Sequence, residues 1–169
     1  MARQTTKSRP PVAPSPTRYE DDLYTWVQEQ VALLRAGRLT EVDARNVAEE
    51  LSDVGNEQYD KLESAIAVLV LHLLKWDHQT ARRSRSWEAT IHEQRRRIDR
   101  VLRKNPGLKP QLLGALAEGY ADGRDRAVAE TDMPYQTFPE NCPFDWKELM
   151  EREIVYVARE KSKPRRTRK

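Results

Sequence analysis

The sequence has only one cysteine, Cys142, and no long hydrophobic run. A single cysteine excludes an internal disulfide framework and a zinc site built from cysteines. The dense apolar run over residues 65–74 is shorter than the roughly 20 residues that a membrane-spanning helix needs. The N-terminal stretch MARQTTKSRPPVAPSPTR lacks the apolar core of a secretory signal. These absences predict a soluble, cytoplasmic protein with no membrane association and no cofactor.

The chain is also poor in apolar residues and rich in charge. Hydrophobic residues make up 38% and charged residues 34% of its 169 residues. This balance is typical of one modest helical domain with charged outer faces and disordered ends. The Pro/Ser/Thr-rich arm over residues 1–18 and the basic tail over residues 158–169 are predicted to be disordered. Residues 19–157 are predicted to form the domain.

Apolar residues recur at helical spacing along the chain, and neither a strand pattern nor a repeat is visible. A first helix is expected from about Tyr19 to Gly37, where glycine provides a left-handed cap. A second helix is expected to begin after Thr40 and to end at Gly55. The short loop between these two helices predicts antiparallel neighbours. The expected fold class is all-α, as a single bundle of five to six helices.

The third expected helix, from Leu62 to Trp76, forms the spine of the fold. Its second half is apolar nearly all round, and such a helix is buried by others around it. Ser84 or Ser86 can cap a fourth, very basic helix. A fifth helix follows Pro110, and a short last helix begins at Asp145.

Charge is distributed unevenly along the sequence. Residues 20–63 carry twelve acidic and four basic side chains, whereas residues 82–109 carry ten basic and three acidic ones. The favoured interpretation is that the two stretches pair within the fold. Within the fourth helix itself, i,i+4 pairs such as Glu93 with Arg97 and Asp99 with Arg103 are also expected. The alternative is a basic surface for an anionic partner.

Four segments of the chain resemble one family when they are taken in series. They are YEDDLYTWVQEQVALLRAGR, DARNVAEELSDVG, LHLLKWDHQTARRSRSWEATIHEQRRRI and FPENCPFDW. Together they resemble the bacterial domain of unknown function 29 family, over roughly Tyr19 to Trp146. One departure is Thr80, where a proline is expected after the glutamine. The resemblance implies an all-α bacterial protein, and it implies no reaction.

A metal site is one candidate for chemistry. Glu49 and Glu50 are expected on the second helix and His72 on the third, and helical bundles hold metals with carboxylates and histidines on facing helices. The Glu-x-x-His signature of such sites is absent. The structural alternative is a buried His72 imidazole that is hydrogen-bonded to Glu49 or Glu50. Cys142 has no local catalytic signature and is expected to be a small buried side chain.

A second candidate is a surface for an anion or a partner around the fourth helix. Its members are Arg82, Arg83, Arg85, Arg96, Arg97, Arg100 and Lys104. These side chains could follow the phosphates of a nucleic acid, with Trp76, His78 and Trp87 stacking on bases. No helix-turn-helix spacing or other known nucleic-acid module is visible.

The preferred functional hypothesis is a non-enzymatic protein-interaction or regulatory module. It leads because no catalytic constellation stands out from the sequence. A metal-dependent enzyme that uses Glu49, Glu50 and His72 is one alternative, and nucleic-acid binding through the arginines is the other. The sequence identifies neither the partner nor the oligomeric state.

Overall fold

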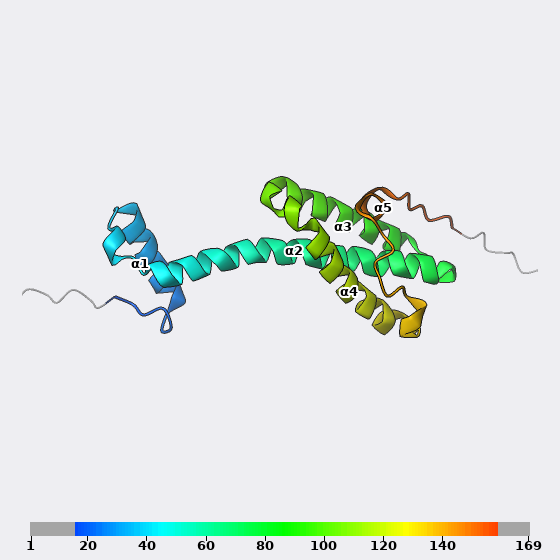
Figure 1. Cartoon of the computed structure of the whole chain (residues 1–169), viewed down its shortest axis with the longest axis horizontal. Coiled ribbons are helices and arrows are strands. Elements are labelled where there is room, and N and C mark those ends of the chain that lie inside the picture. Colours follow the sequence, from blue (N-terminus) through cyan, green and yellow to red (C-terminus); the bar gives the residue numbers. More distant parts are fainter. Residues whose placement is uncertain (1–15, 159–169) are drawn as a thin grey trace, which may run out of the picture. The chain divides into compact units, whose positions relative to one another are not determined.

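A computed structural model of the chain describes residues 16–158, and within this range the fold is all-α. Five helices connected by loops and short 3₁₀ turns are present, and the described residues form no strand (Figure 1). The helices are α1 (Leu23–Arg35), α2 (Ala44–His78), α3 (Arg85–Lys104), α4 (Leu112–Thr131) and α5 (Trp146–Glu151). The predicted fold class is therefore confirmed. The predictions of disorder for residues 1–15 and 159–169 lie outside the described residues.

The chain divides into two compact units, with the boundary between Val54 and Gly55. Unit 1 holds α1 and the first turns of α2, whereas unit 2 holds the rest of α2 and α3 to α5. The single domain predicted over residues 19–157 stays a prediction, because this division reflects compactness alone.

The prediction that a helix ends at Gly55 is wrong. The second and third expected helices form the single 35-residue helix α2, which runs through Gly55. Glycine costs a helix interior only about 1 kcal/mol relative to alanine, and the residues around it, EELSDVGNEQYDKLE, include many good helix formers. Gly37 does have the predicted left-handed backbone, with φ of 70°. The expected antiparallel pair of complete helices is therefore replaced by α1 beside the start of α2.

Unit 1 is held by hydrogen bonds at the start and in the middle of α1. Asp22 caps α1 by accepting a hydrogen bond from the Thr25 backbone N–H. The backbone N–H and the hydroxyl of Thr17 both donate to the Glu29 carboxylate at 2.9 Å. Thr17 belongs to the arm over residues 1–18, whose predicted disorder stays a prediction, and its two hydrogen bonds connect the end of this arm to α1.

The start of α2 is capped by Asp43. The Asp43 carboxylate accepts hydrogen bonds from the backbone N–H and the side-chain amide of Asn46. The backbone N–H of Asp43 in turn donates to the side-chain oxygen of Gln30 at 2.8 Å, which ties α1 to α2 within unit 1.

The core of unit 2 surrounds the second half of α2, as predicted. The buried residues of α2 all lie between Leu62 and Trp76. In Figure 1, α3 and α4 lie along this half of the helix. Two glycines of α4 allow its backbone to approach closely. A Cβ added at Gly119 would lie 2.8 Å from Cγ2 of Ile66, and one at Gly123 would lie 2.6 Å from the carbonyl oxygen of Ala67.

The segment after α4 covers the core without a long helix. Phe138 is fully buried, and the Tyr120 hydroxyl donates to the carbonyl oxygen of Pro139 at 2.6 Å. Arg124 lies over the Tyr135 ring and donates to the carbonyl oxygen of Phe138. These contacts explain how an irregular segment keeps a fixed course over α4.

The predicted helix starts in unit 2 are confirmed. Ser84 caps α3 by accepting from the Trp87 backbone N–H, and Asp145 caps α5 by accepting from the Glu148 backbone N–H. None of the helices in residues 16–158 combines the length and the apolar character that crossing a bilayer requires.

Candidate functional site

The three residues of the predicted metal site all lie on α2. Glu49 and Glu50 belong to unit 1 and His72 to unit 2. The prediction assumed two helices that face each other, and this premise is wrong because α2 is continuous. Among residues 16–158, no group of three His, Cys, Asp or Glu side chains is placed to hold a metal ion.

Glu50 and His72 have separate partners. The Tyr19 hydroxyl donates to Glu50 at 2.6 Å, and this carboxylate raises the pKa of Tyr19 to about 12. Nδ1 of His72 lies 2.9 Å from the carbonyl oxygen of Val68 on the same helix. The structural alternative, in which His72 is hydrogen-bonded to Glu49 or Glu50, is therefore replaced by a bond within α2.

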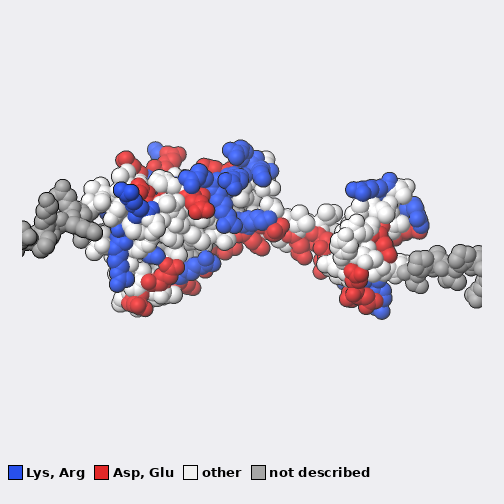
Figure 2. Space-filling model, turned by 180° about the vertical axis from the view of Figure 1, so that it is seen from behind, with Lys and Arg blue, Asp and Glu red and all other residues white. Residues whose placement is uncertain are grey.

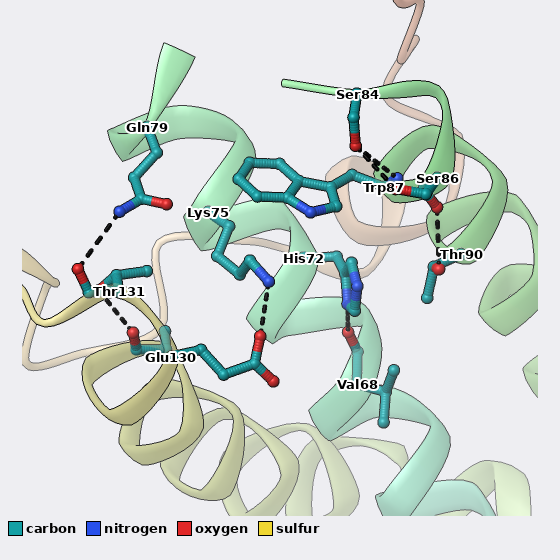
Figure 3. A network of polar contacts seen from close by, with 11 residues as sticks. Val68, His72, Lys75, Gln79, Ser84, Ser86, Trp87, Thr90, Glu130 and Thr131 are labelled. Atoms are coloured by element: carbon teal, nitrogen blue, oxygen red, sulfur yellow. Dashed lines mark hydrogen bonds and ion pairs between the residues drawn. The ribbon is translucent and has the colours of Figure 1, made fainter. Parts of the chain in front are cut away.

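A polar cluster at the junction of α2, α3 and α4 was not predicted (Figure 3). Lys75 of α2 is buried, forms an ion pair with Glu130 of α4 at 2.5 Å, and places Nζ 4.6 Å from the ring centroid of Trp87 of α3. One side chain thus joins three helices. The only signal in the sequence is the lysine itself, which interrupts the apolar run LHLLKW.

The same cluster affects His72, which lies one helical turn before Lys75. Burial lowers the pKa of His72 below its ordinary value, and the positive charge of Lys75 lowers it further. The backbone bond to Val68 and the carboxylate of Glu130 oppose this shift in the pKa. Since Lys75 is occupied by an ion pair and an aromatic ring, the arrangement is typical of a structural junction rather than a reactive site.

The predicted arginine surface divides into an inner and an outer set. Nε of Arg83 donates to the carbonyl oxygen of Trp76 at 2.8 Å, and its guanidinium lies 4.9 Å from the Trp76 ring centroid. The Arg83 side chain is therefore held by contacts within unit 2. Arg82 and Arg85 are exposed where α3 begins.

Arg95 also turns inward, although its partners are not carboxylates. It is buried, and it donates from Nε to the carbonyl oxygen of Leu149 and from Nη1 to that of Arg152. These two carbonyls lie at the end of α5, where a cation compensates the partial negative charge of the helix. Burial lowers the pKa of Arg95, and the nearby Arg152 adds to this effect. Arg152 itself pairs with Asp77.

The remaining cations form one exposed surface on α3, which we name the α3 basic face. Its members are Arg96, Arg97, Arg100, Arg103 and Lys104. They lie opposite the buried side of the helix, which carries Ile91, Gln94, Arg95 and Ile98. In Figure 2, blue side chains gather over the end of α3 that leads to α4.

The α3 basic face is not neutralised by ion pairs within the described residues. None of its five side chains lies within 4.0 Å of a carboxylate oxygen in residues 16–158. The predicted pair of Glu93 with Arg97 is not formed, and neither is that of Asp99 with Arg103. For these side chains, the interpretation that the basic stretch pairs within the fold finds no support in unit 2.

The aromatic rings that were predicted to stack on bases are occupied inside unit 2. Trp76 is buried beneath Arg83, and Trp87 packs against Lys75. The His78 ring makes an edge contact with Phe138, with the ring centroids 5.1 Å apart. None of these three rings is free to act as an exposed stacking platform.

The family model described as Domain of unknown function DUF29 matches residues 18–155. The chain belongs to this family. The match covers both units and every helix described above, and it includes the α3 basic face. Membership indicates no reaction, because the family is defined without a known function. No curated protein and no solved structure matches the chain significantly.

Proposed function

We propose that this member of the family is a cytoplasmic, non-enzymatic protein-interaction module of bacteria, and that the α3 basic face binds an acidic surface of a partner protein. The observation that carries the proposal is a set of five exposed cations on one helix without ion-pair partners among the described residues. Interfaces use such complementary charge to steer association and to reject wrong partners.

The spacing of the α3 basic face suits an extended contact. Arg96, Arg100 and Lys104 follow one another at intervals of four residues, which is a rise of about 6 Å for each step. Four of the five cations are arginines, whose planar guanidinium groups bind carboxylates with two parallel hydrogen bonds.

Two features favour a protein over a nucleic acid as the partner. First, the aromatic rings near α3 are buried or packed, so the stacking that strengthens single-stranded nucleic-acid binding is absent from this part of the described chain. Second, Glu93 and Asp99 lie exposed beside the arginines. These carboxylates would repel a continuous row of phosphates, whereas a protein surface of mixed charge can complement them.

The test is affinity capture from the native host with a matched pair of double variants. Arg96→Glu with Arg100→Glu reverses two charges on the α3 basic face. Arg35→Glu with Arg45→Glu makes the same change in net charge on exposed residues of unit 1. We expect at least one acidic protein to be captured by the wild type and the unit 1 variant, and to be lost with the α3 variant.

A double-stranded DNA column, run at low salt, decides between the two classes of partner. Retention of the wild type that depends on Arg96 and Arg100, together with a set of captured proteins that does not depend on them, would show that the face binds nucleic acid. Captured proteins that are identical for all three forms would likewise contradict the proposal.

A further inference from the structure

Unit 1 contains an apolar groove between α1 and the first turns of α2. Its volume is about 190 Å³, and Gln30 and Glu50 are its only polar lining residues. The apolar lining comes from Trp26, Val27, Val31 and Leu34 on α1 and from Val47 and Leu51 on α2. Every one of these residues belongs to unit 1, so the groove is complete within that unit.

The two walls of the groove have matching apolar spacing. Val27, Val31 and Leu34 on α1 follow the i, i+4, i+7 pattern of a helix face that packs against another helix. Val47 and Leu51 begin the same pattern on α2, and Val54 continues it. Leu51 is nevertheless 67% exposed and Val54 58% exposed.

Unit 1 does not bury these side chains itself. Among residues 16–54, only Trp26 and Gln30 are buried. Two helices bury little apolar surface against each other, and a stable helical unit ordinarily needs a further element on the open side. The groove thus has the shape and composition to which an amphipathic helix binds in helix-in-groove recognition.

The charge of unit 1 indicates what kind of helix fits. Residues 16–54 carry nine acidic and four basic side chains. A second copy of unit 1 would bring the same excess of negative charge, which disfavours self-association. The chain's own basic segment, residues 159–169, has the sequence REKSKPRRTRK, and its only apolar side chain is that of Pro164.

We propose that the groove between α1 and α2 is a docking site for a cationic amphipathic helix of a partner protein. Its apolar side chains occupy the groove beside Leu34 and Leu51, and its basic side chains face the surrounding carboxylates of unit 1. The site is separate in residues and opposite in charge from the α3 basic face, so it would make the protein an adaptor with two unlike surfaces.

The test uses the full chain and a labelled synthetic peptide of about 18 residues, which is five helical turns. The peptide consists of leucine and lysine arranged as an amphipathic helix, and a leucine/glutamate peptide of the same pattern is its charge-reversed counterpart. Fluorescence anisotropy measures both affinities. We expect the lysine peptide to bind at least about tenfold more tightly, because charge complementarity suppresses the wrong partner.

The decisive variant is Leu51→Glu, with Leu113→Glu as its matched control. Leu113 of α4 is 84% exposed, so both substitutions place a carboxylate on an exposed helical site. We expect Leu51→Glu to weaken binding of the lysine peptide by about tenfold or more, and Leu113→Glu to leave it unchanged. Circular dichroism confirms that both variants keep their helices.

The added carboxylate sharpens this test. If attraction were purely electrostatic, Leu51→Glu would strengthen binding of the cationic peptide, and unchanged or stronger binding therefore overturns the proposal. Equal binding of the two peptides overturns the requirement for a cationic helix. Sedimentation that finds a wild-type dimer and a Leu51→Glu monomer would identify a second copy as the occupant and also overturn it.

The variant with Arg96→Glu and Arg100→Glu keeps this experiment independent of the proposed function. It should retain full affinity for the lysine peptide, because both substitutions lie on α3. If the groove does not bind the peptide, the proposal for the α3 basic face still stands. If the α3 basic face binds no partner, the proposal for the groove still stands.

Discussion

The two halves of α2 show how differently one helix can be used. From Leu62 to Trp76 its side chains are buried on nearly every side by the rest of unit 2, whereas none of its residues from Ala44 to Val54 is buried. Both halves are regular helix. Local propensity therefore suffices to continue the helix, and only the packing of neighbouring elements decides which part becomes core.

The two units also differ in which side chains are buried: unit 2 buries some polar side chains, whereas unit 1 leaves some apolar ones exposed. In unit 2, two buried cations have polar partners: Lys75 pairs with Glu130, and Arg95 donates to two backbone carbonyls. In unit 1, apolar side chains such as Leu51 remain exposed. Unit 1 therefore leaves apolar surface exposed among the described residues, whereas unit 2 contains nearly all of the buried core.

The largest contrast is expected from the same substitution in the two halves of α2. Leu69 is fully buried in unit 2, and Leu51 is largely exposed in unit 1. Leu69→Asp should unfold unit 2, because burying an unpaired carboxylate costs several kcal/mol, a large part of the stability of a small domain. Leu51→Asp should leave the helical circular dichroism signal and the melting temperature nearly unchanged. Similar losses for both variants would contradict the comparison.

Two glycines provide the next contrast. Gly123→Ala should destabilise unit 2 by about 1–3 kcal/mol, because its Cβ would collide with the backbone of α2 at Ala67. Gly55→Ala should instead stabilise the chain by roughly 0.5–1 kcal/mol, because Gly55 is helical and the added Cβ would meet nothing within 4 Å beyond the adjacent backbone of its own helix. Urea unfolding measures both changes. A loss of stability in Gly55→Ala would show that this position needs a glycine.

Two nearby arginines of α3 test whether the inward-pointing Arg95 side chain stabilises the fold. Arg95→Met should cost about 1–3 kcal/mol, because the carbonyl oxygens of Leu149 and Arg152 lose their donor. Arg97→Met changes an exposed side chain of the same helix and should stay within about 0.5 kcal/mol. Hydrogen exchange of the α5 amides should quicken only in Arg95→Met. Equal exchange rates in the two variants would show that the Arg95 hydrogen bonds do not hold α5 in place.

The smallest expected effect concerns pH. Because the pKa of His72 is lowered in the folded protein, the unfolded chain binds the proton more readily. The contribution of His72 to stability is therefore complete above the ordinary histidine pKa of roughly 6.5 and is lost as the pH falls below it.

His72→Gln should accordingly reduce the loss of stability between about pH 7.5 and about pH 5.5, a window on either side of that pKa. His92→Gln, at an exposed position of α3, is the control and should leave the loss as it is in the wild type. Urea midpoints at the two pH values measure the difference. An unchanged slope in His72→Gln would mean that His72 does not contribute.

The sequence by itself determined the helical class, the family and most of the helix ends. The buried stretch from Leu62 to Trp76 was predictable because its apolar residues leave no polar side to face water. The caps at Ser84 and Asp145 were predictable because capping depends on side chains within one turn of the helix start. These are local properties, and local properties can be read from a sequence.

The tertiary structure decided the rest. Gly55 can end a helix or lie within one, and the small difference in free energy is set by the surroundings. An arginine on α3 can pair with a carboxylate, cap α5 or face solvent. Which of these three environments it has depends on where residues distant in the sequence lie in the fold. The candidate metal site depended on tertiary structure in the same way, since it required two facing helices and the structure places Glu50 and His72 on the single helix α2. Among residues 16–54, no further α-helix covers the apolar groove of unit 1, and no periodicity in α1 or α2 could reveal this.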